Sequence, residues 1–395
     1  MSEKNVVIGV TGGIAVYKAL DVVSRLKKEN VNVHVIMTKS ACEFVTPLSF
    51  QSLSQNMVIK NMFDEPKAFE IQHISLAKKA DLLVVVPATA NIIGKVANGI
   101  ADDMLSTTIM ATKSKVIFAP AMNTNMYNNP MVKENIKKLQ SYGYEFINPT
   151  SGRLACGDIG DGKLADTEDI VEVIMSQLHE PKDLIGKNVL VTAGPTRANL
   201  DPVRFITNKS TGKMGYAIAK EARDRGANVV LVSGPTNVKP PSGIKVVNVE
   251  TNEEMLNAVM DEFATSDIVV KSAAVADYKP KTYSNQKIKK GPGNLNLELT
   301  RDNDILKTLG TLKKHQILVG FAAESTNVIE NAHKKLQGKN LDYIVANDIT
   351  ESNAGFGADT NRVTIIKRDG KEISLDNMSK RLVGYELFNM ILGYK

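Results

Sequence analysis

Five lysines lie within twelve residues in the second half of the chain, and no acidic residue stands among them. They are Lys279, Lys281, Lys287, Lys289 and Lys290. Such a concentration of fixed positive charge attracts phosphorylated small molecules, nucleic acid or acidic lipid. Taken alone, the run is also compatible with a solvated lysine-rich loop.

A glycine turn near the N-terminus is a second candidate for phosphate binding. Gly9-Val10-Thr11-Gly12-Gly13 joins an apolar run to a helical pattern, so a phosphate could reach the helix N-terminus there. The turn lacks the G-x-G-x-x-G spacing of dinucleotide sites. The next strand ends in Thr38-Lys39-Ser40 rather than in an acid that would bind a ribose. FMN is therefore a better candidate than NAD, and a plain strand-to-helix turn explains the glycines about equally well.

Three polar side chains of the first half could take part in acid–base or carboxylate-binding chemistry. They are the lone His73, Asn123, whose amide can both donate and accept hydrogen bonds, and Cys156, which lies among glycines. Each also has a structural explanation: a satisfied histidine, a turn-capping asparagine and an inert small residue. Cys42 has no comparable context and is assigned to the core.

The apolar pattern predicts the elements that would position these residues. We expect strands over 5–10, 33–37, 82–86, 115–119, 188–192, 228–233, 267–271, 317–321 and 342–346. One helix should bury a face formed by Ile14, Tyr17, Leu20, Val23 and Leu26, and another should run from 215 to 225. Residues 362–367 and 371–374 favour a hairpin around Asp369-Gly370.

Strands that are apolar at every position suit parallel sheets covered on both faces, so we predict two doubly wound, Rossmann-like α/β domains. A length of 395 residues also indicates two domains, and a polar segment over 178–183 suggests boundaries of 1–182 and 186–395. Residues 1–182 hold 19 basic and 19 acidic side chains, whereas the rest hold 30 and 24. The net charge of +6 therefore belongs to the second domain.

Composition excludes several classes of protein. Two cysteines rule out a disulfide scaffold or a cysteine-rich zinc module and suit a reducing cytoplasm. No apolar run reaches the ~18 residues of a membrane span, and the N-terminus does not resemble a signal peptide.

Four motifs of the first half occur in the order and at the spacing of a known family. They run over 12–18, 72–74, 120–127 and 152–158. Together they resemble the homo-oligomeric flavin-containing cysteine decarboxylases, in particular the phosphopantothenoylcysteine decarboxylases. Tyr127 stands where that family usually has tryptophan, and an aromatic ring is retained.

The resemblance implies FMN-dependent oxidation of a cysteinyl group, loss of CO₂ and reduction of the resulting enethiol. It assigns His73 to the oxidative decarboxylation step, Asn123 to the substrate carboxylate, and Cys156 to protonation of the enethiolate. The implied cofactor contacts are Gly12, Gly13, Ser40, Thr89, Asn91, Ser106 and Thr107.

The second half carries a longer set of ordered motifs, over 193–197, 201–208, 210–215, 273–278, 287–290, 320–324 and 346–348. They resemble the phosphopantothenate–cysteine ligases of the CTP-using bacterial type, which form the other half of bifunctional coenzyme A biosynthesis proteins. The chain departs from the usual residues of that family at three places: it has Ala198-Asn199 where Glu-Pro is usual, Thr211 where serine is usual, and Asp302-Asn303 where Asn-Pro is usual. The last departure affects a segment that contacts the cytosine.

This resemblance implies that CTP and 4′-phosphopantothenate form an acyl-cytidylate, from which cysteine displaces CMP to give 4′-phosphopantothenoylcysteine. Cations and Mg²⁺ would offset the charge of several phosphates, with Asp277 contacting Mg²⁺. Asn208 and Lys287 are the implied catalytic residues, and Arg204 helps to hold phosphopantothenate. The implied CTP contacts are Ala273, Ala274, Asp277, Lys287, Lys289, Asn303, Asp304, Ile305, Leu306, Phe321, Lys335 and Lys339.

The resemblance further implies a homo-oligomer, with a trimer-based dodecamer built through the first domain and dimers through the second. We expect a cytoplasmic enzyme without nucleic-acid or membrane partners. One alternative is a flavoprotein redox enzyme whose second domain only binds nucleotide, and CO₂ release would discriminate the two. Another is a nucleic-acid-binding protein, which would need the reader motif and interleaved aromatics that the lysine run lacks.

Overall fold

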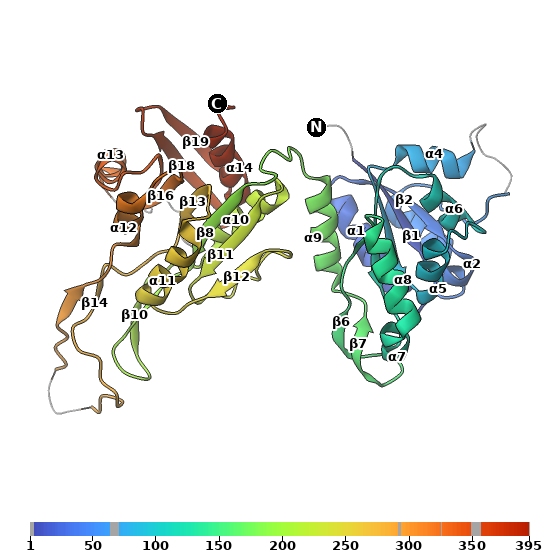
Figure 1. Cartoon of the computed structure of the whole chain (residues 1–395), viewed down its shortest axis with the longest axis horizontal. Coiled ribbons are helices and arrows are strands. Elements are labelled where there is room, and N and C mark those ends of the chain that lie inside the picture. The colour runs from blue at the N-terminus through green and yellow to red at the C-terminus, as the bar shows by residue number, and fades with distance from the viewer. Residues whose placement is uncertain (1–3, 64–70, 291–293, 325, 349–356, 395) are drawn as a thin grey trace. The chain divides into compact units, whose positions relative to one another are not determined.

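The computed structural model describes residues 4–63, 71–290, 294–324, 326–348 and 357–394. The sequence analysis expects no signal peptide at the N-terminus, and residues 1–3, with which that segment begins, lie outside the described set. The chain forms two compact units, residues 1–179 and 180–395, drawn in blue to green and in green to red in Figure 1. The division falls three residues before the position expected from the sequence.

The first unit is built on a five-stranded sheet in which every pair of neighbours is parallel. Its strands, in spatial order, are β2 (Asn32–Met37), β1 (Asn5–Val10), β3 (Leu82–Ala88), β4 (Lys115–Pro120) and β5 (Glu145–Phe146). The order 2-1-3-4-5 is that of flavodoxin-like doubly wound folds, which bind ligands beyond the carboxyl ends of the strands.

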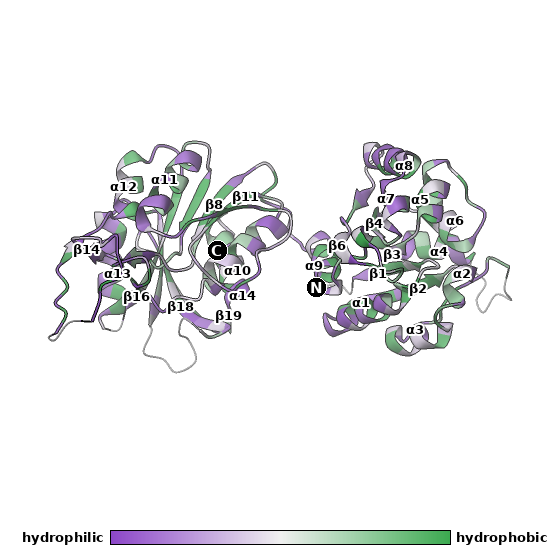
Figure 2. Cartoon of the chain, turned by 90° about the horizontal axis from the view of Figure 1, so that it is seen from below, coloured by the Kyte–Doolittle hydropathy of each residue, from purple (hydrophilic) through white to green (hydrophobic). Residues whose placement is uncertain are grey.

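Helices cover both faces of this sheet because the strands are apolar on both sides (Figure 2). One core lies under α1 (Val16–Lys28), α3 (Pro47–Ser54) and α9 (Thr167–Leu178). The other lies under α4 (Gln72–Lys79), α5 (Ala90–Ala97), α6 (Met104–Ala111) and α8 (Pro130–Ser141). The short helices α2 (Lys39–Cys42) and α7 (Thr124–Asn128) follow carboxyl ends of strands, and β6 (Thr150–Arg153) and β7 (Ile159–Lys163) form a separate hairpin.

The predicted apolar face of the first helix is partly wrong. Val23 and Leu26 are fully buried on α1, but Ile14 and Tyr17 are 61% and 59% exposed. Positions Val16, Ala19 and Val23 form the buried stripe at the spacing of three and four residues that a helix requires. Ile14 and Tyr17 instead face a cavity, which explains why apolar side chains occur there.

The second unit contains an eight-stranded sheet. In spatial order its strands are β12 (Lys245–Asn248), β11 (Asn228–Ser233), β8 (Asn188–Ala193), β13 (Ile268–Lys271), β16 (Ile317–Glu324), β17 (Tyr343–Asp348), β18 (Thr360–Lys367) and β19 (Glu372–Ser379). The first six are parallel in the Rossmann order 3-2-1-4-5-6. The predicted hairpin extends the sheet, with β18 antiparallel to β17 and β19 antiparallel to β18. The prediction of two doubly wound α/β folds is therefore confirmed.

Two groups of helices enclose the second sheet. One core packs under α10 (Lys213–Asp224) and α14 (Lys380–Ile391). The other packs under α11 (Asn252–Phe263), α12 (Ile305–Leu312) and α13 (Val328–Gly338). Two small antiparallel pairs lie outside the main sheet, β9 (Arg197–Asn199) with β10 (Phe205–Thr207) and β14 (Tyr278–Pro280) with β15 (Leu299–Arg301).

The segment that follows α9 belongs structurally to the second unit. Leu184 is fully buried in its core and bonds the carbonyl of Arg225 through its backbone N–H. The Arg225 guanidinium, itself fully buried, pairs with Asp183 at 3.2 Å and with Glu221 at 3.1 Å. These contacts attach the start of the second unit to α10.

Candidate active sites

A cavity of about 610 Å³ opens in the first unit, within the size range of small-molecule sites. It lies where β1, β3 and β4 end, and the β6–β7 hairpin closes one side. Its lining includes Gly12, Gly13, Ile14, Tyr17, Thr89, Met122, Asn123, Met126, Leu154 and Cys156. Five of these were predicted from the sequence as flavin or substrate contacts: Gly12, Gly13, Thr89, Asn123 and Cys156.

The glycine turn and Ser40 approach each other closely at this cavity. A Cβ atom added to Gly12 would lie 2.4 Å from Ser40 Cβ and 2.8 Å from its backbone carbonyl carbon. Glycine is therefore required for the turn after β1 to pack against α2. Two residues predicted to contact a flavin phosphate are thus neighbours, although they are 28 positions apart.

Thr11 connects the ends of two central strands. Its hydroxyl donates to the carbonyl of Pro87 at 2.6 Å and accepts the backbone N–H of Thr89 at 3.1 Å. Thr11 is buried, so these bonds fix the glycine turn relative to the turn after β3. The sequence analysis assigned no role to Thr11.

Asn123 and Cys156 meet at one carboxylate. The Asn123 amide donates to Asp158 Oδ2 at 2.9 Å, and the Cys156 thiol donates to the same oxygen at 3.4 Å. The Asn123 amide also lies 3.4 Å from Cys156 Sγ. Asn123 is held by its second role as N-cap of α7, where its Oδ1 accepts the backbone N–H of Asn125 at 2.8 Å. Both predicted catalytic groups are therefore oriented toward one point.

The hairpin that carries Cys156 is fixed to the loop that carries Asn123. The backbone N–H of Met122 donates to the carbonyl of Gly162 at 2.9 Å. Gly162 has φ of 119°, and a Cβ there would lie 2.4 Å from Met122 O. Only glycine allows this close approach of β7 to the Asn123 loop.

Five predicted residues of the first unit are not among those that line this cavity: Ser40, which lies behind Gly12, and His73, Asn91, Ser106 and Thr107. His73 lies on the first turn of α4. Figure 1 shows α4 at the opposite end of the unit from the β6–β7 hairpin. Ser106 is fully buried, and its hydroxyl forms the capping box of α6 with Asp103. The Thr107 hydroxyl donates to the Ala101 carbonyl at 3.3 Å, and Asn91 is exposed on α5.

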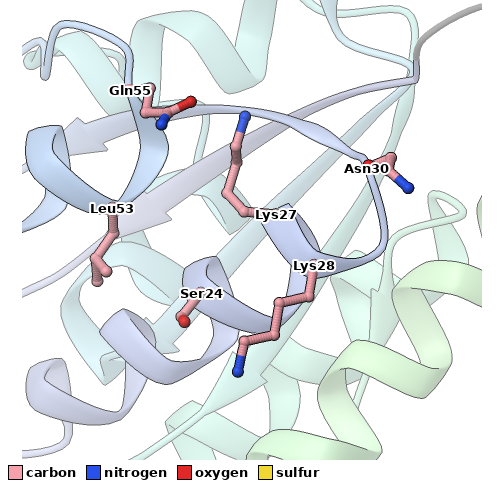
Figure 3. A pocket seen from close by; sticks show the side chains of 6 residues that line it. All are labelled: Ser24, Lys27, Lys28, Asn30, Leu53 and Gln55. Carbon is pink, nitrogen blue, oxygen red and sulfur yellow. The ribbon is translucent and has the colours of Figure 1, made fainter.

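A second hollow of about 510 Å³ lies near the last turns of α1 and α3 (Figure 3). It is lined by Ser24, Lys27, Lys28, Asn30, Leu53 and Gln55. Because α1 runs away from the carboxyl edge of the sheet, this hollow is at the other edge from the glycine turn. None of the predicted site residues lines it.

In the second unit, predicted residues gather where the strand order reverses, between β8 and β13. This is the switch point at which Rossmann-type sheets bind ligands. A pocket of about 120 Å³ there is lined by residues that include Gly212, Lys213, Ala273, Ala274 and Phe321. The Asn208 amide donates to the Ala274 carbonyl at 2.9 Å, so Asn208 lies beside the pocket rim.

Asp201 joins Arg204 to the lysine run. Its carboxylate pairs with the Arg204 guanidinium at 2.7 Å and accepts the backbone N–H of Ile288 at 3.1 Å. The same guanidinium donates to the Ile288 carbonyl. Burial acts to raise the pKa of Asp201, but hydrogen bonds from Ile288, Val203 and Arg204 outweigh it and hold that pKa well below its usual range.

The lysine run divides into two parts. Lys279 pairs with Asp302 at 3.0 Å and Lys281 pairs with Glu298 at 2.6 Å across the β14–β15 hairpin. Lys287, Lys289 and Lys290 are exposed in the following segment, which Ile288 attaches to Asp201. Lys279 and Lys281 are therefore each paired with an acidic residue of this unit. Lys287 begins the second part of the run, which Asp201 holds in place through the backbone of Ile288.

Further predicted nucleotide contacts surround the start of α12. Asp304 is the N-cap of this helix and pairs with Lys339 at 2.8 Å, whereas Lys335 pairs with Glu324 at 2.6 Å. The side chains of Ile305 and Leu306 pack in the core, so this segment offers a ligand its backbone. Asn303 and Asp277 are exposed. Within the described ranges, no group of three or more His, Cys, Asp or Glu side chains could hold a metal ion.

Sequence reasoning missed Thr11, Asp158 and Asp201, although all three lie within or beside quoted motifs. Each acts through a hydrogen bond to a residue distant in sequence, and a motif does not reveal that partner. Asp158 was visible in the motif around Cys156, where only the cysteine received a role.

Two family models match the chain. The model described as Flavoprotein matches residues 1–179, and the one described as DNA/pantothenate metabolism flavoprotein C-terminal domain matches residues 184–394. Across the described residues, every helix is too short or too polar to cross a membrane.

Together with the two family matches, the fold and the cavities define a two-domain α/β flavoprotein, and the predicted flavin class is confirmed.

Full-length relatives identify the family. The coenzyme A biosynthesis bifunctional protein CoaBC of Bacillus subtilis (strain 168) is 52% identical over 394 residues, 99% of this chain and 97% of that protein. The protein of the same name from Escherichia coli (strain K12) is 42% identical, covering 99% and 97%. A crystal structure of the C-terminal domain of a CoaBC protein is 47% identical over 53% of this chain and 96% of that one, with a TM-score of 0.47.

The chain belongs to the family of coenzyme A biosynthesis bifunctional proteins. It is accordingly a bifunctional enzyme with phosphopantothenoylcysteine decarboxylase and phosphopantothenate–cysteine ligase activities, as the motifs predicted.

Proposed function

We propose that the second unit uses CTP to join cysteine to 4′-phosphopantothenate, and that the first unit decarboxylates the product to 4′-phosphopantetheine with FMN. The observation that carries the decarboxylase assignment is the meeting of Asn123 and Cys156 beside a cavity that also contains the glycine turn. The ligase assignment is supported by the polar residues at the switch point of the second sheet and by the lysine segment attached to Asp201.

The cavity of the first unit fits FMN in two respects. Gly12 and Ser40 form a tight backbone turn at a helix start, which suits a phosphate, and apolar side chains such as Ile14, Tyr17 and Met122 suit a flat ring. Bound FMN would supply the electron-accepting and electron-donating chemistry of the decarboxylation. Thr89 and Asn91 remain proposed contacts, and Ser106 and Thr107 would act by placing α6.

The protein's own side chains handle the carboxylate and the proton. The Asn123 amide would donate to the substrate carboxylate and orient it, because an amide N–H₂ is a two-proton donor. The Cys156 thiol would deliver its proton to the enethiolate that remains after CO₂ leaves. Asp158 keeps both groups directed into the same region before the substrate binds.

The ligase reaction places several phosphates and a carboxylate in one site. Lys287 and Lys289 would bind phosphate oxygens of CTP, and Arg204 would help to hold phosphopantothenate. Mg²⁺ would reach the site with the nucleotide and contact Asp277, since Mg²⁺ usually binds through one or two carboxylates plus substrate phosphates. Asn208 would stabilise the acyl-cytidylate beside Ala274.

The decarboxylase assignment is tested with Cys156→Ser in the full chain. We expect the variant to release CO₂ and to accumulate the unreduced enethiol, while ligase turnover stays at the wild-type rate. Normal output of 4′-phosphopantetheine would remove Cys156 from the reaction. Absence of CO₂ release by the wild-type protein would refute the assignment of the first unit.

The ligase assignment is tested with Lys287→Gln against the matched control Lys281→Gln. Lys281 belongs to the same run but is paired with Glu298, so its loss should change cytidylate formation little. Lys287→Gln should lower cytidylate formation by about tenfold or more and leave decarboxylation intact. Equal effects of the two variants would refute a specific role for Lys287.

We also propose that the protein is cytoplasmic and assembles as a trimer-based dodecamer through the first unit, with dimers through the second. Large exposed apolar side chains on the first unit support assembly, among them Leu48 at 68%, Phe63 at 92% and Ile159 at 82% exposure. His73 would then act at a neighbouring chain's site. Light scattering of the purified protein tests this, and a monomer would contradict it.

A further inference from the structure

Lys271 is the last residue of β13, directly before the turn that contains Ala273 and Ala274. Its side chain is half-buried, and its ammonium donates to the Ala273 carbonyl at 2.8 Å. Ala273 is a predicted nucleotide contact whose N–H is bonded to the Thr192 hydroxyl. Lys271 therefore supports the backbone of the proposed CTP site from within the sheet, and no motif pointed to it.

Four charged groups act on Lys271, and all four were predicted to contact CTP. They are Asp277, Asp304, Lys335 and Lys339. Asp304 is neutralised by Lys339 at 2.8 Å, and Lys335 by Glu324 at 2.6 Å. The strand neighbours of Lys271 in the sheet register, Thr192 on β8 and Gly320 on β16, carry no charge. The positive and negative charges of the other members of this cluster therefore nearly cancel, and the Lys271 ammonium adds a further positive charge to it.

The environment of Lys271 penalises its charge. Burial, reinforced by the nearby Lys339, lowers the pKa of Lys271 to about 8, and Asp304 and Asp277 offset this only in part. A neutral amine is consequently present in a substantial fraction of molecules near pH 8. A polyanion placed in this cluster would favour the ammonium form.

We propose that Lys271 is a further positioning residue of the nucleotide site and takes up a proton when the CTP triphosphate binds. This inference rests on the CTP site proposed above and adds a coupled protonation to it. Near pH 8 the ammonium then contributes its full positive charge when the phosphates are present, and the side chain holds the Ala273 carbonyl throughout.

The test is calorimetric titration of the full chain with Mg²⁺-CTP at pH 8, in two buffers with different ionisation enthalpies. Wild-type protein should take up about half a proton per site, because a group with a pKa near 8 is half-protonated at that pH. The nucleotide phosphates are already ionised at this pH and do not contribute. Uptake should approach zero at pH 6.5.

Two substitutions assign the proton. Lys271→Arg keeps a permanent charge, so CTP should bind with little loss of affinity and without proton uptake. Lys271→Met should also abolish uptake and weaken CTP binding by about tenfold. A purely structural role would alter affinity in both variants without changing the number of protons bound.

Lys380 is the necessary control because it lines the switch-point pocket together with Ala273, the residue that Lys271 supports, and burial lowers the pKa of Lys380 to about 8 as well. Persistence of proton uptake in Lys271→Arg, with its loss in Lys380→Arg, would overturn the proposal in favour of Lys380. CTP binding without uptake in the wild-type protein would also overturn it while leaving the CTP site intact. Absence of CTP binding would refute the proposed ligase site and this inference together.

Discussion

Asn123 donates a 2.9 Å hydrogen bond to the carboxylate of Asp158, which lies 35 residues later on the turn of the β6–β7 hairpin. The same carboxylate oxygen accepts the Cys156 thiol at 3.4 Å. Asp158 therefore aligns the amide and the thiol that the proposed decarboxylation requires. One N–H of the Asn123 amide is bonded to Asp158 and the other lies toward Cys156 Sγ at 3.4 Å, so the substrate carboxylate would bind through this second donor, beside the thiol.

Replacing Asp158 by alanine should lower decarboxylase kcat by about tenfold or more, because a hydrogen bond to a charged group is removed from the two positioned side chains. CO₂ release measures the effect, and ligase turnover in the same preparation should be unchanged. Asp161→Ala, which removes an exposed carboxylate bonded to Ser151 within the same hairpin, serves as the control. Wild-type CO₂ release by the Asp158 variant would rule out a positioning role.

Gly162→Ala should destabilise the first unit and abolish decarboxylation, because a methyl group would collide with Met122 O at 2.4 Å and the backbone has φ of 119°. Overpacking and left-handed strain together cost about 2–5 kcal/mol. Thermal unfolding followed by circular dichroism measures this loss. Gly157→Ala is the matched control, since φ is 93° there but nothing lies within 4 Å of the added atom. Equal losses in both variants would show that backbone strain, rather than contact with Met122, is responsible.

Asp201→Asn should raise KM for CTP by about tenfold and leave decarboxylation unchanged, because an amide cannot anchor both Arg204 and the Ile288 N–H as the carboxylate does. The depressed pKa of Asp201 also has a consequence for stability. Its contribution is present above the unfolded pKa of about 3.9 and is lost as pH falls toward the lower folded value.

Unfolding midpoints of wild-type and Asp201→Asn proteins should accordingly differ at pH 6 and converge as pH falls below about 4. Asp359→Asn is a suitable control, because Asp359 also has a lowered pKa, owing to Lys213, but its side chain is 88% exposed. A gap between wild-type and Asp201→Asn proteins that widens at low pH would contradict the assignment.

Arg225→Met should destabilise the second unit by about 3–5 kcal/mol, since it removes a fully buried guanidinium that pairs with Asp183 and with the buried carboxylate of Glu221, which keeps only its longer pair with Arg381 among the ion pairs described. Urea unfolding with ligase activity as the readout checks this. Arg25→Met removes an exposed pair with Asp21 and should change stability by less than about 1 kcal/mol. Similar shifts in both variants would show that burial of the Arg225 network is unimportant.

Local pattern was sufficient to predict the strands, because runs such as 5–10 and 228–233 have consecutive apolar, mostly β-branched residues at their centres and match β1 and β11 residue for residue. Motifs that resemble those of known families led to Cys156, Asn123 and Asn208, and the structure places the first two at one cavity and the third beside the switch-point pocket, while their catalytic roles stay predictions. The pattern did not predict correctly whether Ile14 and Tyr17 are buried, because apolar side chains occur both in a protein core and in the lining of a cavity. Asp158, Asp201 and Lys271 were missed since their roles come from partners or neighbours that only the folded chain brings close.

The attachment of Lys182, Asp183 and Leu184 to α10 also determines where the two activities can be separated by a protease or by splitting the gene. Lys182 donates to the Asp224 carbonyl at 2.6 Å, Asp183 pairs with Arg225, and Leu184 is buried. A break between His179 and Lys182 would leave both cores whole. A break only a few residues later, after Leu184, would remove the Asp183 partner of Arg225 from the ligase half and leave an open cavity in its core.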